Sequence, residues 1–241
     1  MRIIGHRGAT SLAPENTIAG IKAAIKAGVD AIEFDIRVSK DGKLFLCHDA
    51  SLGRTHDVDK KVSGHTSKQL KNIKDSNGVG LPTIEQALTA CGNTPAVIEA
   101  KSGNWAESLA KVLLSHPQKH IHSVISFNHH ELAAFGKACP DIPLYVLEHR
   151  NPFDAINAAR IYNFQGIDIN YWTLNPLAYI LAWRHNLHII VFTVDKIWVA
   201  SFLRVLYPGI SITTNVPQNM QHLRPKIFRT AASKKNEGKR K

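Results

Sequence analysis

One stretch of the chain decides the fold. It reads Ala31-Ile32-Glu33-Phe34-Asp35-Ile36-Arg37-Val38, and Lys40-Asp41-Gly42 separates it from a second apolar run over 43–48. Apolar and charged residues alternate with period two, which predicts a strand over 31–38 with its charged side chains on one face. The short separation leaves room only for a tight turn, so the two runs should form a β-hairpin.

Strand-like and helical segments alternate along the rest of the chain. We predict further strands over 2–5, 95–101, 121–127, 143–147, 166–170, 188–194 and 210–214, and helices over 15–27, 83–91, 104–116, 129–138, 153–160, 175–185 and 196–206. Counting the second arm of the hairpin as an addition leaves eight strands, which a closed barrel requires. We therefore predict an α/β fold, a TIM (β/α)8 barrel with a β-hairpin after its second strand. An open doubly wound sheet is the alternative, but no G-x-G-x-x-G follows the first strand.

The composition places the chain among ordinary globular proteins. Its 241 residues are 44% apolar and 20% charged, with a net charge of +11, which excludes disordered, collagen-like and disulfide-scaffold classes. We predict a single barrel domain over 1–223, with a small polar insertion at the barrel mouth over about 49–82. The last segment, 224–241, holds eight basic residues and one acidic residue, and we predict a disordered basic tail there.

The cysteines and the apolar runs indicate the cellular setting. Cys47, Cys91 and Cys139 are far apart in the sequence and form no C-x-x-C pair, which favours reduced thiols. No apolar run approaches the roughly 20 residues of a membrane helix, and no secretory signal is evident in the sequence. We therefore expect a cytoplasmic protein without a transmembrane segment.

Three carboxylates are predicted to meet inside the barrel. If the apolar face of 31–38 packs on helices, Glu33 and Asp35 point inward, and Glu99 follows from the strand Val97-Ile98-Glu99-Ala100-Lys101. Such a group suits one divalent cation, Mg²⁺ or Ca²⁺, while the lack of nearby Cys or His at ligand spacing disfavours zinc. The structural alternatives are a half-exposed antiparallel strand and a buried Glu99–Lys101 pair.

Two histidines and an arginine are predicted to join them. His6 and Arg7 follow the first strand directly, where the catalytic residues of barrels lie. With a turn centred on Lys40–Asp41, His48 should lie opposite Glu33. Two imidazoles, a guanidinium and a divalent cation suit the cleavage of a phosphate ester. The other histidines, His149 among them, have no supporting residues nearby in sequence, and we assign them no role.

The chain resembles the glycerophosphodiester phosphodiesterase family in an ordered series of motifs. The resemblance extends from Gly5 to about Pro217, and the motifs are His6-Arg7-Gly8, Pro14-Glu15-Asn16-Thr17, Glu33-x-Asp35, Lys40-Asp41-Gly42, His48-Asp49, Leu52-x-Arg54-Thr55, Leu81-Pro82-Thr83-Ile84-Glu85 and Glu99-x-Lys101.

The resemblance implies a metal-dependent TIM barrel that hydrolyses glycerophosphodiesters, such as glycerophosphocholine, to sn-glycerol 3-phosphate and an alcohol. It implies that His6 and His48 are the acid–base pair and that Arg7 and Lys101 bind the substrate phosphate. It also implies that the three carboxylates Glu33, Asp35 and Glu99 are the metal ligands. In the family's proposed route, the 2-hydroxyl of the glycerol attacks first, which gains from proximity.

The carboxyl-terminal half departs from the family pattern. Phe192, Asp195 and Asn215 stand where the family usually has Trp, Asn and Asp. These changes bear on the shape of the substrate pocket. Trp172 is a candidate for contact with a choline-like head group, although a packing role is the simpler explanation.

Other functions stay open. A lysophospholipase D activity on the same scaffold requires an apolar groove, and no exposed apolar segment is evident in the sequence. A phosphatase or another phosphodiesterase fits the ordered motifs less well. A non-catalytic barrel could bind anionic partners through the basic tail, but no aromatic residue interleaves with the charges of 234–241, so no nucleic acid is required. The sequence leaves the oligomeric state unknown.

Overall fold

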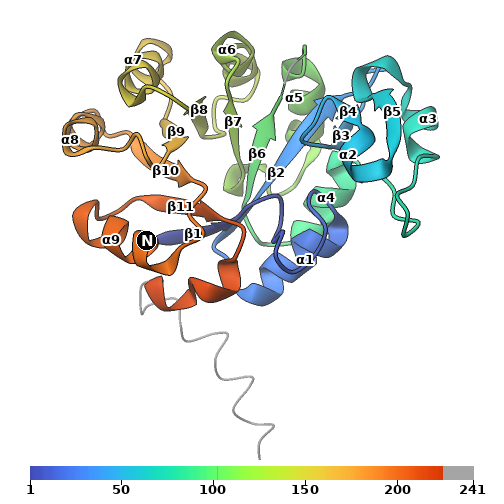
Figure 1. Cartoon of the computed structure of the whole chain (residues 1–241). Helices are drawn as coiled ribbons and strands as arrows, with labels where there is room; N and C mark the ends of the chain where they lie inside the picture. Colours follow the sequence, from blue (N-terminus) through green and yellow to red (C-terminus); the bar gives the residue numbers. More distant parts are fainter. Residues whose placement is uncertain (102, 225–241) are drawn as a thin grey trace, which may run out of the picture.

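The computed structural model describes residues 1–101 and 103–224, and in this part of the chain eight parallel strands close into a barrel (Figure 1). β1 pairs with both β2 and β11, which joins the two ends of the sheet. The predicted α/β barrel is therefore confirmed. In spatial order the strands are β1 (Arg2–Gly5), β2 (Ala31–Val38), β6 (Ala96–Ala100), β7 (Ser123–Ser126), β8 (Leu144–Glu148), β9 (Gly166–Asn170), β10 (His188–Phe192) and β11 (Ser211–Thr214).

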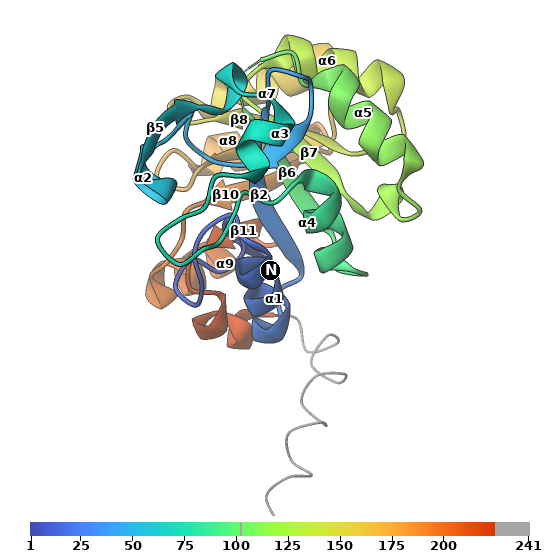
Figure 2. The same ribbon diagram turned by 90° about the vertical axis from the view of Figure 1, so that its right-hand side faces the viewer.

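Helices surround the barrel (Figures 1 and 2). Thr17 and Thr83 begin two of them by accepting a hydrogen bond from the backbone N–H three residues later, which satisfies an otherwise unpaired donor. The helices are α1 (Ile18–Ala27), α4 (Ile84–Cys91), α5 (Ala106–Ser115), α6 (His129–Ala138), α7 (Pro152–Tyr162), α8 (Pro176–Arg184) and α9 (Ile197–Leu206), with 3-10 turns η2 (Lys119–Ile121), η3 (Pro217–Asn219) and η4 (Gln221–Leu223).

The hairpin after β2 exists, but its register differs from the prediction. β3 (Leu44–Leu46) runs antiparallel to the end of β2, with Ile36 opposite Leu46 and Val38 opposite Leu44. Continued, this register sets His48 opposite Phe34, so the predicted pairing of His48 with Glu33 is wrong. The ladder ends at Leu46 instead, and the backbone of His48 is held by a side chain described below.

The insertion has a small core of its own. It contains a two-stranded antiparallel sheet that the sequence pattern does not reveal, and it lies on one side of the barrel (Figure 2). Its elements are β4 (Ser51–Leu52), α2 (Gly53–His56), β5 (Val58–Lys61), η1 (Val62–Gly64) and α3 (Ser67–Lys71). Its apolar side chains pack together with two from the hairpin, and the cluster is Phe45, Cys47, Leu52, Val62, Leu70, Ile73 and Leu81.

Two apolar layers position the site. The outward side chains of the strands, such as Ile32, Phe34 and Ile98, are fully buried against the helices, and each contributes roughly 1.5–3 kcal/mol by leaving water. A second cluster, which includes Ile4 and Val97, fills the barrel interior. Because this interior is packed, the polar residues above it sit on a rigid floor at the carboxyl ends of the strands.

The described chain ends against the barrel. The Arg224 side chain donates to Asp30 Oδ1 from Nε at 3.0 Å, so Arg224 packs with the domain although we placed the boundary before it. The rest of the predicted tail, 225–241, lies outside the described residues. Within the residues that the structure describes, no helix is both long and apolar enough to cross a membrane.

Candidate active site

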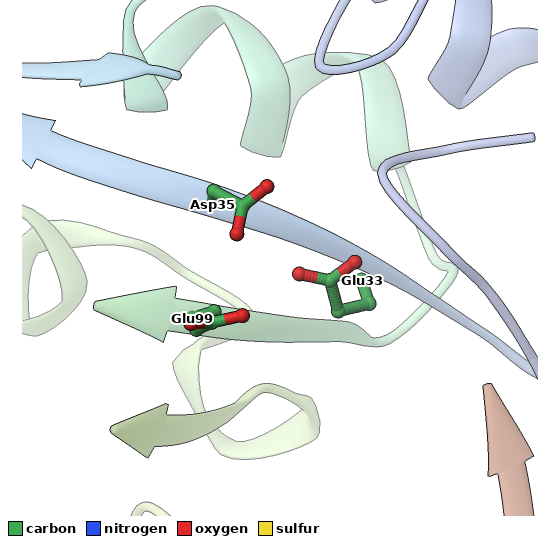
Figure 3. A group of neighbouring side chains, drawn as sticks. All are labelled: Glu33, Asp35 and Glu99. Carbon is green, nitrogen blue, oxygen red and sulfur yellow. The ribbon is translucent and has the colours of Figure 1, made fainter. Parts of the chain in front are cut away.

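Three carboxylates from two neighbouring strands converge inside the barrel (Figure 3). Asp35 on β2 is paired in register with Glu99 on β6, and Glu33 lies one strand period before Asp35. Each residue offers an oxygen, and these three oxygens all lie within 4.8 Å of one another. All three residues are buried. The predicted inward orientation of both strands is therefore correct.

Burial and mutual repulsion shift the pKa values of these acids. Burial, then the charges of Asp35 and Glu99, raise the pKa of Glu33 well above its usual range. Burial and the charge of Asp35 raise the pKa of Glu99 to about 7. Burial also disfavours the ionised form of Asp35, but Lys101 and Arg7 outweigh it and lower the pKa of Asp35 to about 2. Asp35 is thus the acid that ionises most readily, whereas burial favours the protonated forms of Glu33 and Glu99.

Lys101 lies among the carboxylates. Its Nζ is 2.9 Å from Asp35 Oδ1 and also forms an ion pair with Glu99. Burial acts against the charged amine, but the two acids more than compensate and raise the pKa of Lys101. A permanent ammonium therefore lies at the edge of the acidic group, next to the cavity.

The Pro14-Glu15-Asn16-Thr17 motif forms the loop that supports Asp35. The Asn16 amide donates to Asp35 Oδ2 at 2.8 Å, and its carbonyl accepts from the Asp35 backbone N–H at 3.0 Å. Asn16 has a φ of 54°, a left-handed conformation that Asn tolerates better than most residues. The motif thus fixes the orientation of a buried carboxylate.

The turn after β1 directs Arg7 at the same acids. Arg7 donates its backbone N–H to Glu33 Oε2 at 2.8 Å, and its Nε lies 3.3 Å from Asp35 Oδ2. Gly8 follows with a φ of 92°, and a Cβ there would lie 2.6 Å from the Gly20 backbone. Only glycine fits this close approach to α1, which explains the His-Arg-Gly sequence.

His6 is oriented by Asn215, one of the departures from the family pattern. Asn215 donates its amide to Asp195 Oδ2 at 2.7 Å, so its Oδ1 accepts from His6 Nδ1, also at 2.7 Å. The hydrogen on Nδ1 leaves Nε2 with its lone pair, 3.9 Å from Glu33 Oε2. Burial lowers the pKa of His6. His6 is therefore a neutral imidazole with a free basic nitrogen at the cavity.

His48 lies at the start of the insertion, and hydrogen bonds hold both its backbone and its side chain. Arg37 donates from Nε to its backbone carbonyl at 2.9 Å, and His48 Nδ1 donates to Asp49 Oδ1 at 2.7 Å. Arg54 binds Asp49 at 2.6 Å and reaches across to Glu15 at 2.6 and 2.8 Å. Arg7 also binds Glu15, at 3.1 Å. Ion pairs therefore link the insertion to the turn after β1.

These side chains line one cavity of about 230 Å³ at the carboxyl ends of the strands. All of the predicted site residues except Asp35 line it; Asp35 lies behind them, bonded to Lys101 and Asn16. The lining residues are His6, Arg7, Glu33, His48, Glu99, Lys101, Ile125, Phe127, Leu147, His149, Asp168, Phe192, Thr193 and Thr213.

The sequence analysis missed four polar residues of this cavity, of which two are titratable: His149 and Asp168, with Thr193 and Thr213. His149 follows β8 as His6 follows β1, and its ring packs between Phe127 at 4.6 Å and Phe192 at 5.3 Å. Asp168 is an inward acid in the middle of the apolar strand β9, with Oδ1 lacking any hydrogen-bond partner among the described residues. Burial and the charge of Glu99 raise the pKa of Asp168 well above its usual range. The sequence signal that could have found them is their position: Asp168 lies within a predicted strand, and His149 lies just after one.

Trp172 does not belong to the cavity lining. Its side chain is 76% exposed and packs on Tyr171 with ring centres 4.6 Å apart. The candidate contact with a head group is therefore wrong, and the aromatic wall of the cavity consists of Phe127, His149 and Phe192.

The donor set fits a hard divalent cation. Glu33 Oε1 is buried and has no hydrogen-bond partner among the described residues, and it faces two further carboxylates. Clustered carboxylate oxygens are the donors that Mg²⁺ or Ca²⁺ binds, and such an ion would displace the protons that raised pKa values favour. The structure thus supplies a buried acidic site, and the identity of the ion belongs to the proposal below.

Comparisons with known proteins agree with this geometry. Residues 6–217 match the glycerophosphoryl diester phosphodiesterase family. A glycerophosphodiester phosphodiesterase of Caldanaerobacter subterraneus is 30% identical over 159 residues, which are 60% of this chain and 65% of the relative. A glycerophosphodiester phosphodiesterase of Bacillus altitudinis is 32% identical over 61% of this chain and 66% of its own length. The chain therefore spans about two thirds of the length of these two relatives. One of Bacillus subtilis is 27% identical over 89% of this chain and 83% of its own length.

Solved structures share the fold. A phosphodiesterase of Oleispira antarctica, in complex with its product sn-glycerol-3-phosphate, superposes with a TM-score of 0.86 at 22% identity, over 92% of this chain and 96% of that one. A glycerophosphodiester phosphodiesterase of Thermotoga maritima gives a TM-score of 0.78 at 21% identity, over 93% and 98%. With the barrel, the acidic group and a family match over most of the chain, this protein belongs to the glycerophosphoryl diester phosphodiesterase family.

Proposed function

We propose that the protein hydrolyses glycerophosphodiesters to sn-glycerol 3-phosphate and an alcohol. One observation carries the proposal: two histidines, two cations and a buried acidic group face a single cavity. Phosphodiester cleavage needs a proton acceptor, a proton donor and positive charge near the phosphoryl oxygens. The cavity supplies all of them. The family match and the product bound by the Oleispira antarctica homologue support the same reaction.

Arg7 and Lys101 are the phosphate-binding residues in this proposal. Both line the cavity, and both are paired with buried acids that hold them in place. A planar guanidinium can bind two phosphate oxygens at once, whereas an ammonium acts as a point charge. The phosphate therefore lies between the turn after β1 and the end of β6.

Glu33, Asp35 and Glu99 hold one divalent cation, Mg²⁺ or Ca²⁺. When bound, this ion adds positive charge against the phosphoryl oxygens. The protein's own contribution is to keep the three carboxylates in place through Asn16 and the Arg7 backbone. Asp35 is charged in advance because the neighbouring cations lower its pKa to about 2.

His6 acts as the general base and His48 as the general acid. His6 is neutral, with Nε2 free, because burial lowers its pKa and Asn215 holds the Nδ1 hydrogen. It takes the proton of the attacking hydroxyl as the new bond to phosphorus forms. His48 donates Nδ1–H to Asp49, which orients the ring, and the protonated form of this imidazole is the general acid in the proposal. His48 can then give its Nε2 proton to the departing alcohol oxygen as the phosphorus–oxygen bond breaks. When the attacking hydroxyl is the 2-hydroxyl of the glycerol, this leaves a cyclic phosphate, which one water molecule then opens to glycerol 3-phosphate.

The aromatic wall faces the head group. Phe127, His149 and Phe192 present ring faces and edges next to the cavity, which suits the positive head group of glycerophosphocholine. We also infer a reducing, cytoplasmic compartment, because all three cysteines are unpaired and buried.

The deciding experiment is a coupled assay of glycerol 3-phosphate release from glycerophosphocholine and glycerophosphoethanolamine. Release with Mg²⁺ or Ca²⁺ that stops with EDTA supports the reaction and the ion together. A separate choline assay tests the alternative: cleavage of lysophosphatidylcholine to choline and lysophosphatidic acid, with no release from either glycerophosphodiester, would replace the proposal with a lysophospholipase D. No release from any of these substrates would leave the non-catalytic barrel as the better account.

A further inference from the structure

Two adjacent helices present wide apolar surfaces to solvent. On α8, Leu177, Ile180 and Trp183 are exposed, and Trp183 is 70% exposed. Tyr179 on α8 connects the two helices, because its ring lies 5.2 Å from Tyr207 at the end of α9 and its hydroxyl donates to the Pro208 carbonyl at 2.7 Å. Soluble monomers rarely expose a continuous apolar area of this kind without using it.

On α9 the apolar surface covers the whole outer side. Val199, Ala200 and Leu203 face the core, yet the opposite side is also apolar and exposed. At the spacing of one helical face it carries Ile197, Trp198, Phe202, Val205 and Leu206, with Val205 78% exposed. We call these five residues, with Leu177, Ile180 and Trp183 of α8, the α8–α9 face.

The charged residues within α8 and α9 are all basic. Among the described residues from 155 to 224 there are only two acids. Asp168 is buried inside the barrel, and Asp195 is engaged by Asn215. The charged side chains on α8 and α9 are the exposed Arg184 and Arg204, and Lys196 directly precedes α9. The exposed acids nearest in sequence are Asp195, which accepts hydrogen bonds from Asn215, and Asp154 on α7.

The sequence that follows the described residues is also basic. Residues 225–241 contain seven basic residues and one acid. The segment begins after η4, which contacts α9. An apolar face with tryptophans and arginines, followed by a basic segment, matches the surface of a protein that lies on a bilayer.

We propose that the α8–α9 face docks on an anionic lipid bilayer. Its tryptophans, Trp183 and Trp198, have rings suited to the depth of the lipid head groups. Arg184 and Arg204 meet anionic head groups at the same time. A second copy of the chain fits the face less well, because a two-fold interface would bring these cations against their own copies.

Docking also bears on the cavity. α8 and α9 begin at the carboxyl ends of β9 and β10, where the cavity opens. The face lies on the side of the barrel away from the insertion (Figure 1). A docked barrel would therefore hold one rim of its mouth beside the membrane. The docking itself does not depend on the proposed reaction, since none of its residues lines the cavity.

The test is co-sedimentation of the full-length protein with vesicles. We expect strong binding to phosphatidylcholine vesicles with 30% phosphatidylglycerol and at least about tenfold weaker binding to pure phosphatidylcholine, because the cations act only on the charged lipid. Three of the four tryptophans are exposed and Trp105 is buried, so binding should also move tryptophan emission to shorter wavelength. No sedimentation with anionic vesicles overturns the proposal.

Variants locate the contact. Trp198→Ser combined with Phe202→Ser should lower the bound fraction at least about fivefold, because the apolar area of α9 is lost, whereas Leu114→Ser on α5 should not. Arg184→Glu with Arg204→Glu should weaken binding to the charged vesicles, and Lys137→Glu on α6 should not. If the α8–α9 variants bind the vesicles as well as the control variants do, the assignment to this face is contradicted.

Two further measurements separate other outcomes. Hydrolysis of soluble glycerophosphocholine should be unchanged in every variant, so a failure of docking and a failure of the proposed reaction are distinguishable. Sedimentation velocity without lipid checks for self-association. A wild-type dimer that Trp198→Ser and Phe202→Ser convert to a monomer, without binding to vesicles, would assign the face to a second copy and overturn the proposal.

Discussion

The two halves of the barrel contribute different chemistry to the same cavity. β1, β2, β6 and the insertion supply the charged groups, from His6 to Lys101, and these are joined by ion pairs. β7, β8 and β10 supply Phe127, His149 and Phe192, whose contacts are between rings. In the proposed function, the reaction therefore depends on one set of strands and the choice of substrate on another. Substitutions in the first half should change turnover, and substitutions in the second should change the choice of substrate.

The largest effect should come from the two histidines of the charged half. His6→Ala and His48→Ala should each lower kcat by ~10²–10⁴-fold, because general acid–base catalysis contributes this much. Steady-state kinetics measures the loss, and circular dichroism shows that the fold is kept. His120→Ala, at the other end of the barrel, should be unaffected. Near-normal turnover in either variant removes that histidine from the mechanism.

Metal affinity should depend on the same half and on pH. Glu33→Ala should weaken binding of Mg²⁺ or Ca²⁺ by more than the ~10–100-fold that loss of an outer-shell partner costs, whereas Glu107→Ala on the surface should not. Because burial raises the pKa of Glu99 to about 7, the ion displaces a proton below pH 7, and affinity should fall as pH falls from 8 to 6. Calorimetry in two buffers measures both. Equal affinity at pH 6 and 8 would refute the proton displacement.

Asp168 tests where the boundary between the halves lies, because it is an acid from the second half. Its pKa is raised by burial and by Glu99, so the folded state holds a proton that the unfolded state releases above about pH 4. Wild-type stability should therefore fall as pH rises toward the folded pKa. The Asp168→Asn variant should not show this loss of stability. In the wild type the loss amounts to about 1.4 kcal/mol for each unit by which the pKa of Asp168 is raised on folding. Urea unfolding of both proteins at pH 5 and pH 8, with EDTA present, measures the change in the free energy of unfolding. The same change with pH in the wild type and in Asp168→Asn would contradict the prediction.

The smallest effect should come from the aromatic wall. Phe192→Leu should raise KM for glycerophosphocholine about 2–5-fold, as expected for loss of an exposed cation–π contact of ~0.5–1 kcal/mol. KM for glycerophosphoglycerol, whose head group is uncharged, should stay the same. An equal change for both substrates would mean that Phe192 shapes the pocket without recognising charge.

Local periodicity was enough to predict most of the fold. The alternation in 31–38 placed Glu33 and Asp35 inside the barrel, and each predicted strand and helix is present with shifts of a few residues at its ends. The three carboxylates could be found for the same reason, since the side-chain period of a strand sets which residues share its face. The motifs then predicted His6, His48, Arg7 and Lys101 as site residues, and all four line the cavity.

Contacts between distant residues could not be predicted in this way. His48 reaches the cavity because the ladder ends at Leu46 and Arg37 holds its carbonyl, not because of strand register. Asn215 orients His6 across 209 positions of sequence. His149 gained a role only when β8 was placed beside Phe127 and Phe192.

The eight-stranded barrel, the inward acids and the family could all be predicted from the amino-acid sequence. These follow from short-range patterns, in which a few neighbouring residues specify a strand, a turn or a helix cap. The tertiary structure alone decided the tautomer of His6, the ion pairs between the insertion and Glu15, and the exposure of the α8–α9 face. Each of these features depends on contacts between residues that are distant in the sequence. Such residues come together, or stay apart, only when the barrel closes.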